Sequence, residues 1–129
     1  MNMPIKQGGS DSGHWLWFLQ RITGIGVLVT IVIHWIIQHI GVENDPINYA
    51  DVVVRLSQPG YRLLYTLFLM LAVFHGFHGL WMVGRDYLHA NWSRTGLAAV
   101  LVAASACFFV WGLTILFTGY EITRAAVVP

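Results

Sequence analysis

The chain has 129 residues, of which 57% are hydrophobic and 10% are charged, and its formal net charge is +1. A soluble globular domain carries about 25% charged residues, and so short a chain cannot bury this much apolar surface in its own core. The composition excludes an ordinary soluble domain, and the absence of a Lys/Arg cluster argues against a nucleic-acid partner. It indicates a small integral membrane protein, with residues 1–129 forming a single domain.

The N-terminal residues 1–16 are largely polar and begin with a glycine-rich stretch, "MNMPIKQGGSDSG". This stretch lacks the basic-then-apolar order and the small-residue cleavage site of a signal peptide. We therefore expect residues 1–16 to be retained as a cytoplasmic segment.

Three apolar runs follow, at about residues 17–40, 61–83 and 96–118. Each is long enough for the ~20 residues that cross ~30 Å of hydrocarbon. Backbone in lipid must satisfy its own hydrogen bonds, so each run is predicted to be a helix and the fold to be all-α with three transmembrane helices. The polar connection between the first two runs fits a short surface helix over residues 48–56. The third run has no ionisable residue, and we expect it to be scaffolding.

The distribution of basic residues predicts the orientation of the spans, because cytoplasmic loops are enriched in Lys and Arg. Four such residues lie on the side of the N-terminus and three on the opposite side: Lys6, Arg21, Arg85 and Arg94 against Arg55, Arg62 and Arg124. We expect a cytoplasmic N-terminus and, with an odd number of spans, a C-terminus outside.

Three of the six histidines, His34, His75 and His78, lie inside predicted spans. Ionisable residues at membrane depth are rare and mark either function or a hydrogen bond to a neighbouring helix. His75 is followed by Gly76 and, one turn on, by Gly79. Such small residues let a flat macrocycle or another helix come close. Neutral imidazole is a common axial ligand of haem iron, so His75 is a candidate ligand.

His75 shares a face of its predicted helix with Asp86. Eleven residues come to about 20° past three full turns and ~16 Å along the axis. This face carries an imidazole at mid-depth and, at the cytoplasmic edge, a carboxylate beside the phenol of Tyr87. Interfacial polarity alone accounts for such a pair. A phenol and a carboxylate are also suited to bind a quinone carbonyl and to handle its protons.

The segment "HGFHGLWMVGRDYL" resembles the second-helix signature of the D-type, cytochrome b membrane-anchor subunit of succinate dehydrogenase (succinate:quinone oxidoreductase). That signature is His, three residues, Gly, six residues, then Asp-Tyr; here these are His75, Gly79, Asp86 and Tyr87. The segment "FLQRITGIG" of the first run is similar to the Arg-x-(Ser/Thr)-Gly segment that opens the first helix of such anchors. The three-helix layout matches as well, so the resemblance extends over most of the chain.

The resemblance implies a role for each matching residue. His75 matches the axial ligand of haem b, and Asp86 and Tyr87 match residues at or beside the quinone pocket, with Tyr87 as the hydrogen-bond donor. Arg21 matches an arginine near the haem propionates, where a guanidinium suits a carboxylate; positive-inside anchoring is the alternative. His78 lies about 60° round the helix from His75. It is expected to bond a propionate or a neighbouring helix, or to line the quinone pocket.

His34 stands outside the pattern of a single haem. At 1.5 Å per residue it lies ~25 Å from the cytoplasmic end of its span, against ~15 Å for His75, so the two cannot share one ligand plane. Some members of the family carry two stacked haems ligated by histidines of different helices, and His34 is placed where an outer haem would need one. A polar link between helices is the alternative, because Thr30 and Gln38 lie along the same face.

The resemblance implies an anchor that binds haem b and quinone in respiratory complex II and is not an enzyme alone. The membrane would be the cytoplasmic membrane of a bacterium or archaeon, where lipid surrounds the helices. A second anchor subunit would complete the helical bundle and its one or two haems. Electrons from succinate would pass through a flavoprotein with FAD and an iron–sulfur subunit to ubiquinone or menaquinone. Two alternatives remain: an anchor of a quinol:fumarate reductase, and a haem-free structural or assembly protein.

Overall fold

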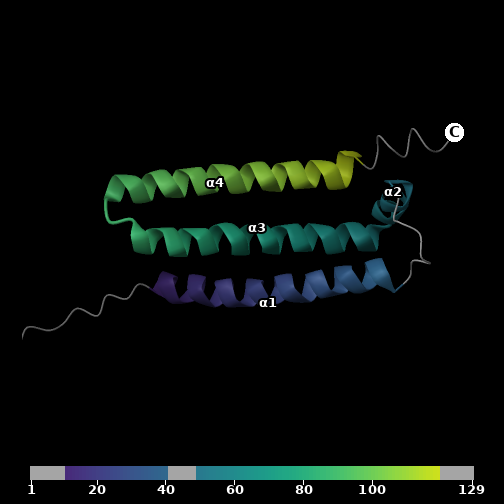
Figure 1. The fold of residues 1–129 in the computed structure, drawn as a ribbon, viewed down its shortest axis with the longest axis horizontal. Coiled ribbons are helices and arrows are strands. Elements are labelled where there is room, and N and C mark those ends of the chain that lie inside the picture. The colour runs from purple at the N-terminus through teal and green to yellow at the C-terminus, as the bar shows by residue number, and fades with distance from the viewer. Residues whose placement is uncertain (1–10, 41–48, 120–129) are drawn as a thin grey trace, which may run out of the picture.

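The computed structural model describes residues 11–40 and 49–119. There are three long helices: α1 (Asp11–His39), α3 (Pro59–Tyr87) and α4 (Asn91–Thr114). A short helix α2 (Tyr49–Ser57) lies between α1 and α3, and a π-helical turn η1 (Ile115–Gly119) continues α4. The long helices lie side by side with α3 in the middle (Figure 1). The described residues contain no strand, which confirms the predicted all-α fold class.

Within the described residues, three stretches are long and apolar enough to cross a membrane: Gly13–His39, Pro59–Tyr87 and Asn91–Thr118. All three long helices begin before the corresponding hydrophobic runs, and α3 also continues past the end of its run into polar residues. Helix α1 begins at Asp11, so residues 11–16 of the expected N-terminal segment are helical, whereas residues 1–10 lie outside the described part. Helix α2 lies in the connection for which the sequence predicts a surface helix.

Small and hydroxyl-bearing residues form the face of α1 that meets α3. Thr23 and Thr30 are both buried, and each donates its hydroxyl hydrogen to a carbonyl one turn earlier, at 2.8 Å. Their polar hydrogens are therefore satisfied inside the helix. A methyl group on Gly26 would lie only 3.0 Å from Leu71 of α3. Such compact residues let two membrane helices approach closely.

The contacts between α1 and α3 follow an antiparallel register. Gly24 of α1 lies against His75 of α3, and ten residues later in α1 the ring of His34 meets Tyr65, ten residues earlier in α3. At 1.5 Å per residue these two levels are about 15 Å apart along the helix axis. His75 and His34 therefore lie in the same interface at different depths.

The other side of α3 packs against α4. Gly112 of α4 leaves room for Leu69, and the rings of Phe77 and Phe108 lie 5.9 Å apart. Within the described residues Val53 is the one buried hydrophobic side chain, and no large side chain is fully buried. The apolar side chains thus face outward, as expected for helices that contact lipid and neighbouring membrane helices.

Candidate cofactor site between α1 and α3

The half-buried imidazole of His75 lies in the α1–α3 interface, against the backbone of Gly24. A methyl group at position 24 would come within 2.9 Å of the His75 Cε1 atom and 3.3 Å of its Nδ1 atom. Side chains essentially never approach so closely, so Gly24 is what allows the ring to occupy this position.

The Nδ1 atom of His75 faces two acceptors on α1. It lies 3.2 Å from the backbone oxygen of Gln20 and 3.5 Å from the Thr23 hydroxyl oxygen, whose own hydrogen goes to Leu19. A carbonyl oxygen can only accept, so the arrangement favours a hydrogen on Nδ1 that is donated to Gln20. The lone pair then lies on Nε2, to which no hydrogen bond is found from the described residues.

The side chain of Gln20 reaches across to α3 and contacts both histidines there. Its Nε2 donates to the backbone oxygen of His75 at 3.0 Å and also lies 3.3 Å from His75 Nδ1. Its Oε1 lies 2.9 Å from His78 Nδ1. Gly79 makes room for this amide, since a methyl group there would lie 3.0 Å from Gln20 Nε2. His78 is thus bonded to a neighbouring helix, which is one of the roles expected for it.

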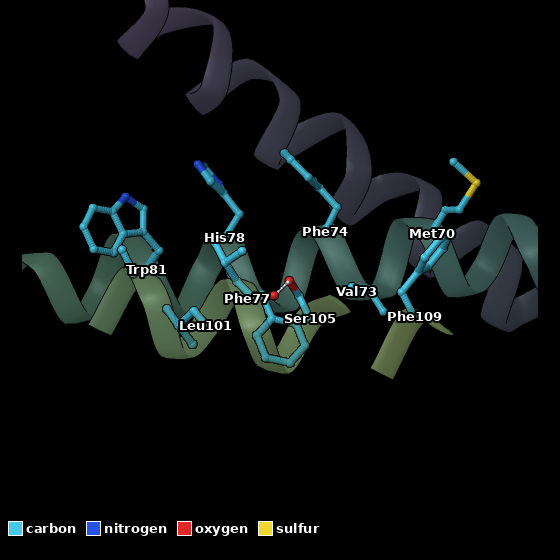
Figure 2. Close-up of a pocket in the computed structure, with 11 residues that line it drawn as sticks. Met70, Val73, Phe74, Phe77, His78, Trp81, Leu101, Ser105 and Phe109 are labelled. Carbon is cyan, nitrogen blue, oxygen red and sulfur yellow. Dashed lines mark hydrogen bonds between the residues drawn. The ribbon is translucent and has the colours of Figure 1, made fainter. Parts of the chain in front are cut away.

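A groove of about 510 Å³ runs between α3 and α4 (Figure 2). Its walls are mostly aromatic and aliphatic, and the side chains with polar atoms are His78, Trp81 and Ser105. The His78 ring stacks on Phe74, with the centroids 5.3 Å apart and the planes 8° apart. Ser105 donates its hydroxyl hydrogen to the Val102 carbonyl at 2.9 Å, so its oxygen can accept. His78 thus belongs to both the α1–α3 interface and the groove, whereas His75 does not line the groove.

About 15 Å along the α1–α3 interface from His75, the ring of His34 meets the ring of Tyr65 edge-on, with centroids 5.4 Å apart. Its Nδ1 atom is buried and has no hydrogen-bond partner among residues 11–40 and 49–119. Gln38 donates to the Tyr65 hydroxyl at 3.3 Å and accepts a hydrogen bond from Arg55 of α2. These four side chains line a cavity of about 280 Å³ together with Val52, Leu56 and Leu116.

The other expected site residues lie apart from His75. Arg21 is exposed, and its guanidinium sits 4.0 Å from the centre of the Trp17 ring. Asp86 and Tyr87 end α3, and both are exposed. Residues 11–40 and 49–119 therefore leave the phenol and the carboxylate uncovered.

Gln20 is not among the residues that the sequence motifs single out, whereas Thr23 and Gly24 belong to the Arg-x-(Ser/Thr)-Gly segment. The structure places all three around His75. Spacings of three and four residues put them on one helix face. Polar and small residues on one face of an otherwise apolar membrane helix mark the side that packs on a neighbour. That stripe was the signal in the sequence for the α1–α3 contact.

The arrangement of the two imidazole nitrogens of His75 is suited to axial ligation of haem iron. A metal-ligating imidazole usually donates its other N–H to a carbonyl or carboxylate, which fixes the tautomer and the ring orientation. His75 has this arrangement with the Gln20 carbonyl. The described residues include no group of three His, Cys, Asp or Glu side chains able to hold a metal ion alone. Haem iron needs fewer protein ligands, because the porphyrin supplies four nitrogen ligands and the protein only axial ones.

Comparison with known proteins places the whole helical region in one family. Residues 3–118 match the family described as succinate dehydrogenase/fumarate reductase transmembrane subunit. The chain is 31% identical over 102 residues to the succinate dehydrogenase hydrophobic membrane anchor subunit of Archaeoglobus fulgidus, covering 79% of this chain and 86% of that protein. It is 22% identical over 95 residues to the subunit of the same name from Thermoplasma acidophilum, covering 74% of this chain and 77% of that protein.

Proposed function

The chain belongs to the succinate dehydrogenase/fumarate reductase transmembrane subunit family, and from that premise we propose that it is the membrane anchor of a succinate dehydrogenase. Its three apolar helices hold the complex in the cytoplasmic membrane of a bacterium or archaeon, with the N-terminus inside. Oxidation of succinate takes place on partners: a flavoprotein with FAD and an iron–sulfur subunit. A second anchor subunit covers part of the outward-facing apolar surface.

Within this anchor, His75 is the proposed axial ligand of haem b. The observation that carries this role is the 3.2 Å contact from His75 Nδ1 to the Gln20 carbonyl, because it leaves Nε2 as the ligating atom. When bound, the haem supplies a one-electron redox centre. The chain's own residues hold the imidazole: Gly24 admits the ring and Gln20 fixes its tautomer. A partner anchor would supply the other protein ligand of the haem iron.

The proposed quinone site lies at the end of α3, at Asp86 and Tyr87. A phenol donates a hydrogen bond to a quinone carbonyl, and a carboxylate takes up and releases protons. Their exposure supports a site whose other wall is a partner subunit. Helix α1 begins at this same end of the bundle (Figure 1). Arg21 therefore lies toward the quinone end of α1, where its positive charge suits the haem propionates.

A second haem, held by His34, is a further candidate. The observation that favours it is that the His34 Nδ1 atom is buried and has no hydrogen-bond partner among the described residues, since an unpaired buried polar atom destabilises a fold unless something else satisfies it. The separation of about 15 Å from the level of His75 leaves the two haems at different depths.

Assembly and direction are tested together by purifying the tagged full-length chain from its native membranes. The proposal predicts that a flavoprotein, an iron–sulfur protein and a second anchor are recovered with it. It also predicts that succinate-dependent quinone reduction is faster than quinol-dependent fumarate reduction. The reverse ratio of rates would identify a quinol:fumarate reductase, and recovery without flavin or iron–sulfur clusters would indicate a structural or assembly protein.

A further inference from the structure

The amide group of Gln20 lies between two histidines that are one turn apart on α3. Its nitrogen is 3.0 Å from the backbone oxygen of His75, and its oxygen is 2.9 Å from Nδ1 of His78. The amide therefore contacts the backbone of His75 and the ring of His78, and its nitrogen also lies 3.3 Å from the His75 Nδ1 atom.

The orientation of this amide follows from the chemistry of its partners. The oxygen and nitrogen ends of an amide have the same shape, so the hydrogen-bond network decides which way it points. The carbonyl oxygen of His75 can only accept, so it must face the NH₂ end. The Oε1 atom of Gln20 must then face His78 Nδ1, and an acceptor there requires a hydrogen on Nδ1.

A hydrogen on Nδ1 determines what His78 presents elsewhere. In a neutral imidazole one nitrogen carries the hydrogen and the other carries a lone pair. Stacking on Phe74 holds the ring plane, and His78 lines the α3–α4 groove. The described residues make no hydrogen bond to Nε2 of His78. This atom is thus an acceptor in largely apolar surroundings.

We propose that Gln20 is a positioning residue that holds His78 in the Nδ1–H tautomer, so that Nε2 of His78 accepts a hydrogen bond from a hydroxyl-bearing apolar ligand such as a quinol. The tautomer of His78 is inferred from the contacts of Gln20 within this chain alone. Its use by a quinol rests on the proposed function.

The test is ¹⁵N NMR of the complete complex with labelled histidine, reduced with dithionite so that any low-spin haem iron is diamagnetic. His78 is assigned from a His78→Asn variant. In the wild type we expect a pyrrole-type Nδ1 and a pyridine-type Nε2. Gln20→Leu, which removes the acceptor, should move His78 Nδ1 toward the pyridine-type range. His75 should keep its tautomer in that variant, because its acceptor is the backbone oxygen of residue 20.

Gln20→Glu keeps an oxygen acceptor and should preserve the pyrrole-type Nδ1 of His78. The opposite tautomer of His78 in the wild type would overturn the proposal. So would an unchanged His78 tautomer in Gln20→Leu, or equal changes at His75 and His78 in that variant. Loss of the pyrrole-type Nδ1 of His78 in Gln20→Glu would also overturn it. Haem and quinone contents are measured separately on the same samples. Their absence would count against the proposed function and leave the tautomer test intact.

Discussion

The imidazole of His75 lies so close to Gly24 that one methyl group at position 24 would meet its Cε1 atom at 2.9 Å. Moving this ring away would break the contact between its Nδ1 atom and the Gln20 carbonyl. The contact joins the glycine of the first-helix motif to the histidine of the second-helix motif. It places both residues at the same level of the α1–α3 interface.

Gly24→Ala should displace the His75 ring and lower the haem content of the purified complex. Overpacking a close interface costs about 1–3 kcal/mol, which equals or exceeds the ~1 kcal/mol that alanine gains over glycine in a helix. The measurements are haem per complex and the thermal midpoint. Gly13→Ala is the matched control, because that glycine is also in α1 and none of the described residues lies within 4 Å of its added methyl group. Wild-type haem content in Gly24→Ala would contradict the proposed position of the ring.

His34→Leu should lower the haem content from two per complex to one. Leucine is apolar and of similar size, so it removes the Nδ1 atom, which has no partner in the described part of the chain, without leaving a large cavity, and the anchor should remain folded. The measurement is pyridine haemochrome absorbance per flavin. One haem in both proteins, with an equal or higher thermal midpoint for the variant, would instead identify His34 as a residue between helices.

Tyr87→Phe should slow quinone reduction by up to about tenfold, because a neutral hydrogen bond contributes about 0.5–1.5 kcal/mol. Succinate oxidation by a water-soluble acceptor should not change, since that reaction does not use the quinone site. Trp92→Phe is the control, because Trp92 is 81% exposed and Tyr87 79% exposed. Equal loss of both activities in Tyr87→Phe would point to faulty assembly.

Arg55→Met should loosen helix α2. Arg55 donates to Gln38 of α1, and Val53 is the buried hydrophobic residue of α2. Loss of one such bond costs about 1 kcal/mol, which corresponds to about fivefold faster amide hydrogen exchange over Tyr49–Ser57. The control is Val54→Met, at an exposed position in the same helix. Unchanged exchange in Arg55→Met would show that Val53 and its apolar neighbours hold α2 without this bond.

The three membrane helices could be predicted from the sequence because length and apolar composition belong to a continuous segment. Their ends could not, since α1 and α3 continue into polar flanks where hydropathy no longer reports on the backbone. The assignment of the chain to its family rested on the spacing of His75, Gly79, Asp86 and Tyr87, and the comparisons confirm it.

The surroundings of His75 could not be read from the sequence, because they depend on the register between segments 55 residues apart. Gln20 and Arg21 are neighbours in the chain but point about 100° apart on a helix, so only one of them can face α3. The motif draws attention to Arg21, whereas the structure places Gln20 against the histidines. The roles of Arg21, Asp86 and Tyr87 depend on subunits outside this chain and stay predictions.

Haem ligation by His75 is tested most directly by the dithionite-reduced minus oxidised absorbance spectrum of the purified complex, in the wild type and in His75→Ala. Ligation predicts a b-type band in the wild type that is lost in His75→Ala and restored by added imidazole. His39→Ala, which changes an exposed histidine at the C-terminal end of α1, should leave the band unaffected. A b-type band of wild-type size and position in His75→Ala, or no such band in the wild type, would contradict the account.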